Sequence, residues 1–322
     1  MPGSKRALEV LVDGLFDYAG MFPPSSLSFD DAIIASASFS HELKRPSLVG
    51  ADLVLGVEHL SRLRIELLQQ IGFDSQRAFL VCVLGSTLAA AEEPSRADEL
   101  KSLELFNRTE ANSSIRRHIV SYELKLSQNL QTDHHSAVQR VSEIQSRLEK
   151  ERLMIFLEPD LSVAAWESVL ENICGVIKVV NDSSEGPRIG LKARASGPTA
   201  ATPAKFAAII SEVATAQLHF KATAGLHHPI VERARYHNEL GFLNMATALY
   251  LKRHLGSAFS NQDLLGCLTC EQSSAYRFED ELQWNEQRLS VRDLELLKEN
   301  FHFSIGSCSL HEPDQDLLRL FG

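Results

Sequence analysis

The sequence predicts an α/β protein: a (β/α)8 barrel of the TIM type that spans residues 1–322 as a single domain, with a helical insertion near residues 257–300. Short apolar runs alternate with longer stretches of helical spacing, which indicates repeated βαβ units. Several runs are continuously apolar, as is typical of strands buried on both faces of a parallel sheet. The rival fold, a doubly wound open sheet, lacks its usual marker, since neither GxGxxG nor GxxxxGK[ST] occurs.

Eight segments rich in Val, Ile and Phe are the expected strands: Ala51–Val57, Ala78–Gly85, His118–Leu124, Leu153–Glu158, Val176–Val180, Ile189–Arg194, His219–Thr223 and Phe303–Ser307. The expected helices lie between them: Leu60–Ile71, Ser136–Lys150, Ala164–Ile173, Pro203–Ala216 and Phe242–Leu255. Thr202 is a plausible N-cap because Pro203 suits a first helical position. The insertion is expected to hold a weak seventh strand of the barrel.

Composition and charge exclude several classes of protein. The 322 residues carry 32 Lys and Arg against 42 Asp and Glu, a formal net charge of −10. This surplus of acid argues against binding nucleic acid or an anionic membrane, since both require basic patches. The apolar runs are far shorter than the roughly 20 residues that span a bilayer. Five scattered cysteines indicate a reducing compartment, so a cytoplasmic location is expected.

The first polar cluster lies in the segment Gly190–Gly197. Alternation along the expected strand places Lys192 and Arg194 on one face. In a barrel this face points inward. Burying two cations there has a large desolvation cost, which indicates that they have a function. The alternative is an exposed strand whose charges are solvated.

The second cluster follows one βα unit later. Lys221 and Thr223 share a face, and Lys221 lies 29 residues after Lys192. Both lysines are therefore expected on consecutive strands, pointing into one cavity. Two neighbouring ammonium groups lower each other's pKa, which is one way to obtain a nucleophilic lysine. Alternatively, one or both bind a phosphate or carboxylate.

Three further groups are candidates for the same site. His227 and His228 are suited to acid–base catalysis, phosphate contact or, for one of them, metal binding. Glu158 at a strand end is either an acid–base residue or part of a structural ion pair. Near the C-terminus an apolar strand ends in a turn of small residues whose amides can cradle an anion: Gly306, Ser307, Cys308 and Ser309. Cys308 is either a nucleophile or, by default, small buried filler.

Several motifs resemble those of a family of uncharacterised bacterial proteins. They are Tyr18–Pro24, Lys192-x-Arg194, Phe220–Pro229, Gly241–Asn244, Gly306–Ser309 and Glu312-Pro313. The resemblance implies that these stretches belong to one site, which adds Asn244 to the expected anion-binding residues. The aromatic and proline-rich Tyr18–Pro24 segment is expected either to cover the barrel mouth or to plug the barrel bottom.

The paired lysine strands also resemble those of class I aldolases of the deoxyribose-phosphate type. The segments that carry the resemblance are Lys192–Gly197 and Lys221–Gly225. It implies that one of Lys192 and Lys221 forms a Schiff base while the other perturbs it. Arg194 departs from the aldolase pattern, which favours anion binding at the first strand.

The leading hypothesis is an enzyme that acts on a small anionic metabolite, phosphorylated or carboxylated, by lyase chemistry through a lysine imine. Lys192 or Lys221 would be the nucleophile, and His227, His228 or Glu158 would move protons. Arg194, Thr223 and the turn of residues 306–309 would hold the anion. No cofactor is expected, although a metal-dependent enzyme with His227 or His228, Glu158 and Glu312 as ligands is one alternative. The other is a non-catalytic binding or scaffold protein, and the sequence leaves homo-oligomerisation open.

Overall fold

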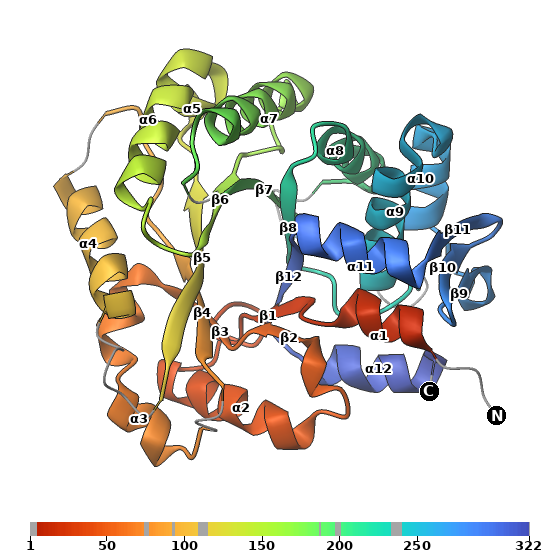
Figure 1. Ribbon diagram of the computed structural model, residues 1–322, viewed down its shortest axis with the longest axis horizontal. Helices are drawn as coiled ribbons and strands as arrows, with labels where there is room; N and C mark the ends of the chain where they lie inside the picture. Colours follow the sequence, from red (N-terminus) through yellow and green to blue (C-terminus); the bar gives the residue numbers. More distant parts are fainter. Residues whose placement is uncertain are drawn as a thin grey trace.

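A computed structural model describes residues 5–73, 77–91, 94–108, 115–186, 188–196, 201–232 and 240–321. Its main sheet confirms the predicted (β/α)8 barrel: nine strands curl into a ring surrounded by helices (Figure 1). Every neighbouring pair of strands in this sheet is parallel. In spatial order the strands are β2 (Val49–Ala51), β1 (Phe16–Tyr18), β12 (Phe303–Ser307), β8 (His219–Thr223), β7 (Ile189–Arg194), β6 (Met154–Glu158), β5 (Arg117–Lys125), β4 (Phe79–Leu84) and β3 (Leu53–Gly56).

The two end strands of this sheet, β2 and β3, are consecutive in sequence, and only Asp52 separates them. They act as one interrupted strand, because β2 pairs with β1 and β3 pairs with β4. The buried Asp52 carboxylate binds the Arg77 guanidinium at 2.8 and 2.6 Å and accepts a hydrogen bond from the Leu80 amide. The ring is therefore closed, and the nine segments correspond to the eight strands of the barrel.

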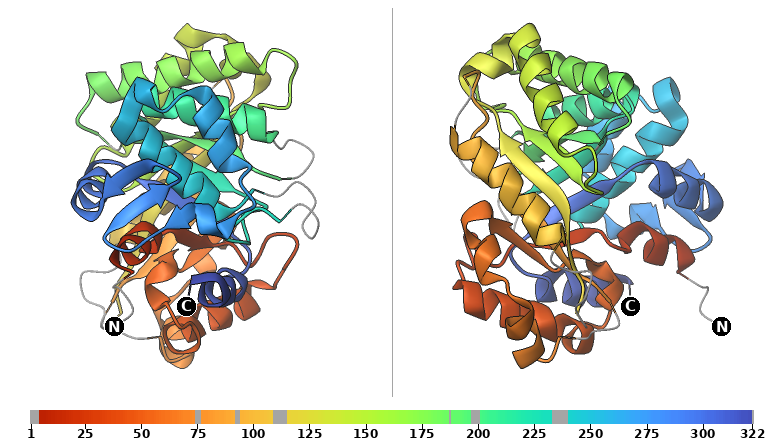
Figure 2. Two further views of the ribbon diagram at one scale, coloured as in Figure 1. Left: turned by 90° about the vertical axis from the view of Figure 1, so that its right-hand side faces the viewer. Right: turned by 60° about the vertical axis from the view of Figure 1, so that its left-hand side comes forward.

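Helices cover the outside of the ring (Figures 1 and 2). They are α1 (Arg6–Val12), α2 (Phe29–Glu42), α3 (Ile65–Gln70), α4 (Pro94–Arg108), α5 (Gln128–Thr132), α6 (His134–Arg147), α7 (Trp166–Ser183), α8 (Pro203–Thr215), α9 (Phe242–Leu255), α10 (Asn261–Leu268), α11 (Val291–Asn300) and α12 (His311–Phe321). Short 3-10 turns cover Pro46–Leu48, Val57–Arg62, Gly256–Ala258 and Ser273–Ala275. Thr202 caps α8 as predicted, since its side chain accepts a hydrogen bond from the Lys205 amide.

Apolar side chains form two separate clusters. The larger one contains most of the buried apolar residues, on the strands and on the helices that cover them. The smaller one consists of Ala51, Val54 and Cys82, with Leu84 and Phe22 packed against it. Cys82 contacts Lys221, so this second cluster lies inside the barrel, on β2, β3 and β4. The barrel interior is thus apolar on one side, and its polar residues are left to the remaining strands.

The insertion near residues 257–300 is only partly helical. Between α10 and α11 it forms a three-stranded antiparallel sheet: β9 (Tyr276–Arg277), β10 (Glu281–Trp284) and β11 (Gln287–Ser290). This sheet lies outside the barrel, beside α9 and α10 (Figure 1). The expectation that the insertion holds a barrel strand is wrong, because all nine strands of the main sheet lie outside residues 257–300.

Three further differences concern individual elements. The predicted strand Val176–Val180 is wrong: these residues belong to the helix α7, and Val176, Ile177 and Val180 lie on its buried face. Such a short apolar run reads equally as a strand or as one side of a buried helix. The first barrel strand, Phe16–Tyr18, was not predicted because it has only three residues. The predicted helix Leu60–Ile71 is divided into a 3-10 turn and α3.

Among the described residues, no helix is both long and apolar enough to cross a membrane.

Closure of the barrel at β2 leaves no room for a side chain at Gly50. A Cβ atom there would lie 2.4 Å from the Gly14 carbonyl oxygen and 3.1 Å from Asp17 Oδ1. We expect Gly50→Ala to lower the free energy of unfolding by about 1–3 kcal/mol, because backbone at the closing strand must shift. Gly175→Ala in α7 is the matched control: its Cβ would meet only ordinary contacts from 3.4 Å outward, so a gain of about 0.5–1 kcal/mol is expected. Urea denaturation of both variants measures the difference, and equal stability of the two would contradict this account of closure.

Candidate active site in the barrel cavity

A cavity of about 520 Å³ opens among the loops that follow the strands. Ligands bind at this carboxyl end of the strands in (β/α)8 barrels. Many of the predicted site residues line this cavity: Lys192, Arg194, Lys221, Thr223, His227, His228, Gly306 and Cys308. The predicted cluster is therefore gathered around one cavity and is not scattered over the surface.

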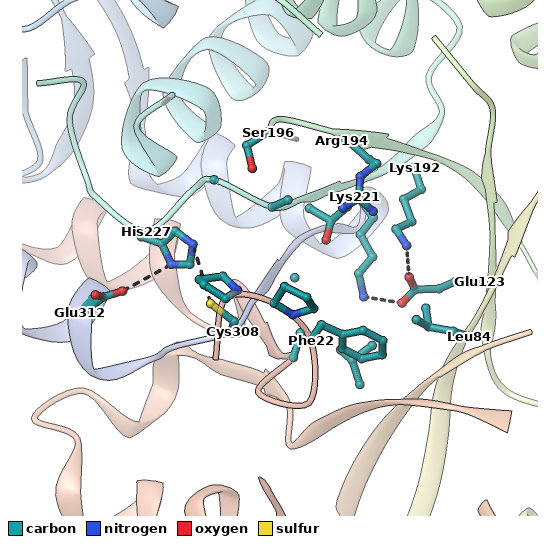
Figure 3. Close-up of a pocket in the computed structure, with 18 of the residues that line it drawn as sticks. Phe22, Leu84, Glu123, Lys192, Arg194, Ser196, Lys221, His227, Cys308 and Glu312 are labelled. Carbon is teal, nitrogen blue, oxygen red and sulfur yellow. Dashed lines mark hydrogen bonds and ion pairs between the residues drawn. The ribbon is translucent and has the colours of Figure 1, made fainter. Parts of the chain in front are cut away.

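Lys192 and Lys221 occupy directly paired positions on the neighbouring strands β7 and β8. The carboxylate of Glu123 on β5 lies between them, with Oε2 at 2.8 Å from Lys192 Nζ and Oε1 at 2.7 Å from Lys221 Nζ (Figure 3). All three side chains are almost completely buried, with exposed fractions of 7%, 1% and 1% for Lys192, Lys221 and Glu123. One carboxylate thus bridges both ammonium groups, as a buried charge requires.

Further charged groups extend this bridge on both sides. Lys221 also pairs with Asp17 on β1, whose carboxylate accepts a 2.8 Å hydrogen bond from the Ser304 hydroxyl on β12. Lys192 also pairs with Glu158 on β6 at 2.6 Å, and Glu158 lies 3.6 Å from the Arg194 guanidinium. The network therefore contains three cations and three carboxylates, and its formal charges cancel.

The bridging carboxylates decide the protonation state of the two lysines. Burial alone would lower the pKa of Lys192, but Glu123 and Glu158 raise it above its ordinary value. Burial opposes the charge of Lys221 in the same way, and Asp17 and Glu123 hold its pKa well above the ordinary value. The expectation that the two ammonium groups lower each other's pKa is therefore wrong, because Glu123 lies between them. Burial would raise the pKa of Glu123, and the two lysines instead lower it to about 2.

The opposite wall of the cavity is apolar. Val54 and Leu84 line it from β3 and β4, and Phe22 and Pro23 line it from the Tyr18–Pro24 segment. Of the two expected roles for this segment, the position agrees with covering the barrel mouth. Ser25 holds its end in place by donating a hydrogen bond to the carbonyl of Cys308, the residue after β12.

A second polar group lines the cavity at its outer side. Cys308 Sγ lies 3.8 Å from His227 Nε2, and His227 Nδ1 lies 3.5 Å from Glu312 Oε2 (Figure 3). These residues come from the loop after β12, the loop after β8 and the helix α12. His228 also lines the cavity, and its Nδ1 is paired with Asp316 at 2.6 Å.

Four predicted residues are absent from the cavity lining: Glu158, Asn244, Ser307 and Ser309. Glu158 instead lines a neighbouring pocket together with Arg194. Asn244 is buried in α9. Its Oδ1 accepts a hydrogen bond from the Val231 amide, and its Nδ2 donates to the carbonyls of Cys267 and Cys270 and to the Tyr276 hydroxyl. Asn244 therefore fastens the insertion to the barrel. The Ser307 hydroxyl donates to the Ser309 carbonyl, and neither residue lines the cavity. Gly197, the last residue of the first predicted cluster, lies outside the described residues.

The residues proposed for a metal centre are divided between the two polar groups. Glu158 pairs with Lys192 and Arg194, whereas Glu312 pairs with His227 and Asp316 pairs with His228. Within the part of the chain that the structure describes, no three His, Cys, Asp or Glu side chains are grouped to hold a metal ion. The ligand set of the metal-dependent alternative is therefore not assembled.

Sequence reasoning missed two residues of the charged network, Asp17 and Glu123. Glu123 lies inside the predicted strand His118–Leu124, at an inward position between apolar neighbours, and this buried carboxylate was the available signal. Asp17 had no comparable signal, because its three-residue strand was not recognised.

Comparison with known proteins shows the fold only. No family model matches the chain, and no curated protein matches it. A crystal structure of a putative deoxyribose-phosphate aldolase from Toxoplasma gondii is similar with a TM-score of 0.52 and 12% identity, covering 98% of this chain and 96% of that one. A xylose isomerase-like TIM barrel/4-hydroxyphenylpyruvate dioxygenase fusion protein has a TM-score of 0.40 and 11% identity, covering 74% of this chain and 37% of that one.

The bridged network predicts a large effect of removing one cation. Lys221→Met leaves Asp17 and Glu123 buried without their shared partner, and we expect a loss of about 3–5 kcal/mol of unfolding free energy at pH 7. The loss should shrink as the pH falls, because protonation then removes the uncompensated charge. Lys178→Met, at an exposed position of α7, is the control and should change stability by less than about 0.5 kcal/mol. Denaturation curves at pH 5 and pH 7 test this, and a loss that does not depend on pH would contradict it.

Proposed function

We propose that this protein is an enzyme that forms an imine between Lys192 and a small anionic aldehyde or ketone, and that makes or breaks a carbon–carbon bond next to the imine carbon. The observation that carries the proposal is the pair of facing lysines on β7 and β8, bridged by Glu123 at the wall of a cavity. The aldolase-like neighbour supports it through the fold alone.

The contacts of the two lysines assign them different roles. Lys221 is 1% exposed and lies between Asp17 and Glu123, with the Cys82 thiol 3.5 Å away. It is fixed as a permanent ammonium group. Lys192 is the more exposed of the two at 7%. Lys192 is therefore the nucleophile, and Lys221 supplies a fixed positive charge beside it.

Imine formation requires that Lys192 first lose a proton. Its Nζ contacts Glu158 at 2.6 Å, so the proton has an acceptor within hydrogen-bonding distance. The neutral amine then adds to the carbonyl carbon, and loss of water gives the imine. Because an iminium ion withdraws electrons, it stabilises negative charge on the adjacent (α) carbon. The bond between this α carbon and the next (β) carbon can therefore break or form. His227 lines the same cavity and would carry protons to and from the reacting carbons.

An anionic group on the substrate would be held by Arg194 and Thr223. The Arg194 side chain is 36% exposed, far more than either lysine, and its 3.6 Å contact with Glu158 leaves it able to pair with a ligand. The space beside Thr223 exists because residue 306 has no side chain: a Cβ there would lie 2.9 Å from the Thr223 hydroxyl oxygen. A carboxylate or phosphate fits this charge pattern.

Borohydride trapping tests the nucleophile. Incubation with a panel of small aldehydes and ketones that carry a carboxylate or phosphate, followed by reduction, should place a stable adduct on Lys192. Peptide mass mapping locates it. Lys192→Met should abolish the adduct, while the exposed control Lys178→Met should keep it. An adduct on Lys178 or other surface lysines only, with none on Lys192, would overturn the proposal.

The pH dependence of trapping distinguishes the role of the Lys192 amine from that of its proton acceptor, Glu158. Since Glu123 and Glu158 raise the pKa of Lys192, the neutral fraction of this amine is small at pH 7 and grows about tenfold per pH unit below the pKa. Trapping should therefore increase from pH 7 to pH 10. Glu158→Gln lowers the pKa of Lys192 and should increase trapping at pH 7, while turnover decreases for lack of the acceptor. Trapping that is independent of pH and unchanged in Glu158→Gln would contradict this assignment.

A further inference from the structure

Cys308 and Glu312 take no part in the imine chemistry proposed above, and both lie next to His227. The Cys308 thiol, the His227 imidazole and the Glu312 carboxylate are arranged in series at 3.8 and 3.5 Å. All three line the cavity, on the side away from Lys192 and Lys221 (Figure 3). A thiol next to an imidazole that in turn lies near a carboxylate resembles the arrangement of an activated nucleophile.

The surroundings of the thiol favour its anionic form. Burial would raise the pKa of Cys308, but contacts with His227 and Ser25 lower it overall. Tyr18 from β1 also faces the thiol, and burial together with the charge of Cys308 raises the pKa of Tyr18 to about 12, so this hydroxyl remains neutral. Glu312 is the carboxylate that contacts His227, and it is more than half exposed. Its charge is therefore largely screened at the thiol, and the imidazole 3.8 Å away is the dominant influence.

The remaining cysteines have different surroundings. Cys82, Cys174 and Cys267 are buried, and burial raises the pKa of each. Cys270 is partly exposed, and its thiol faces the Gln272 carbonyl. Cys308 therefore combines access to the cavity with an imidazole partner, and Cys270 provides an internal reference for an accessible thiol without one.

We propose that Cys308 is a second nucleophile of the cavity, that His227 takes up its proton, and that Glu312 orients His227. Its ligand is a small aldehyde. The choice of an aldehyde rests on the proposed function, because an enzyme that forms an imine at Lys192 admits carbonyl compounds to this cavity. The reactivity of the Cys308 thiol does not depend on the proposed function.

The addition balances without any other reactant. A bond forms between Cys308 Sγ and the aldehyde carbon while the C=O π bond breaks. The thiol proton passes to His227 Nε2 and from there to the former carbonyl oxygen, which gives a hemithioacetal. The reverse of the same steps releases the aldehyde, so the adduct is reversible.

Alkylation with iodoacetamide tests the thiol. The bond to sulfur then forms with loss of iodide, and peptide mapping gives a separate rate for each cysteine. At pH 6.5 we expect Cys308 to be alkylated faster than Cys270, since the thiolate is the reactive form and the imidazole of His227 favours it. His227→Gln should slow Cys308 to the rate of Cys270 and move its pH profile to that of an ordinary thiol. Glu312→Gln should give a smaller decrease.

Two outcomes would overturn the nucleophile. One is alkylation of Cys308 no faster than that of Cys270 at pH 6.5. The other is an unchanged rate for Cys308 in His227→Gln, provided that its circular dichroism spectrum matches the wild type. Cys308→Ser should lose only the fast phase of alkylation, which confirms the assignment of that phase.

The aldehyde is tested in the Lys192→Met variant, which cannot form the imine. Acetaldehyde should slow alkylation of Cys308 there at concentrations that leave Cys270 unaffected. Absence of this protection would overturn the aldehyde as ligand. Because the variant lacks Lys192, protection of Cys308 and trapping on Lys192 succeed or fail separately, and the failure of one proposal is distinguishable from that of the other.

Discussion

The bridge that Glu123 makes between Lys192 and Lys221 is the interaction on which the cavity depends. A buried ammonium group is tolerated only with a paired charge, and here one carboxylate from β5 serves two cations from β7 and β8. The contact requires these strands to keep their register, because a slip of one residue would turn each side chain to the opposite face of the sheet. The bridge thus fixes both the alignment of the strands and the positions of the lysines.

The same bridge changes what the cations can do. Three cations that faced a cavity without carboxylates would attract any anion, but Asp17, Glu123 and Glu158 cancel their charge. Arg194 is the one cation of the network that is substantially exposed, so the proposed binding of an anion would depend on it. The carboxylates also provide a destination for a proton, which a bare pair of ammonium groups lacks. Val54 and Leu84 form the apolar wall of the cavity.

Much of this arrangement could be predicted from sequence, and its limits have physical causes. The 29-residue spacing of Lys192 and Lys221 matches one βα unit, so periodicity alone placed them on neighbouring strands. The protonation state of Lys221 could not be predicted, because it depends on two carboxylates that are distant in the chain. Glu123 lies 98 residues before Lys221, and Asp17 lies more than 200 residues before it. The prediction that Asn244 binds the anion is wrong. The sequence does not distinguish a polar residue that binds a ligand from one that binds the backbone of an insertion, as Asn244 does.

The cavity holds two kinds of nucleophile whose surroundings act in opposite directions. Carboxylates raise the pKa of Lys192, so this amine is protonated until an acceptor such as Glu158 takes its proton. An imidazole and a hydroxyl lower the pKa of Cys308, so this thiol loses its proton more readily than an ordinary cysteine. The surroundings therefore ease deprotonation of Cys308 and oppose deprotonation of Lys192. Under the two proposals a carbonyl compound would add more readily to Cys308, whereas Lys192 would add only after its ion pairs with Glu123 and Glu158 are disturbed. If the proposed anion binds at Arg194, it competes with Glu158 for this guanidinium and so changes the charge balance around Lys192.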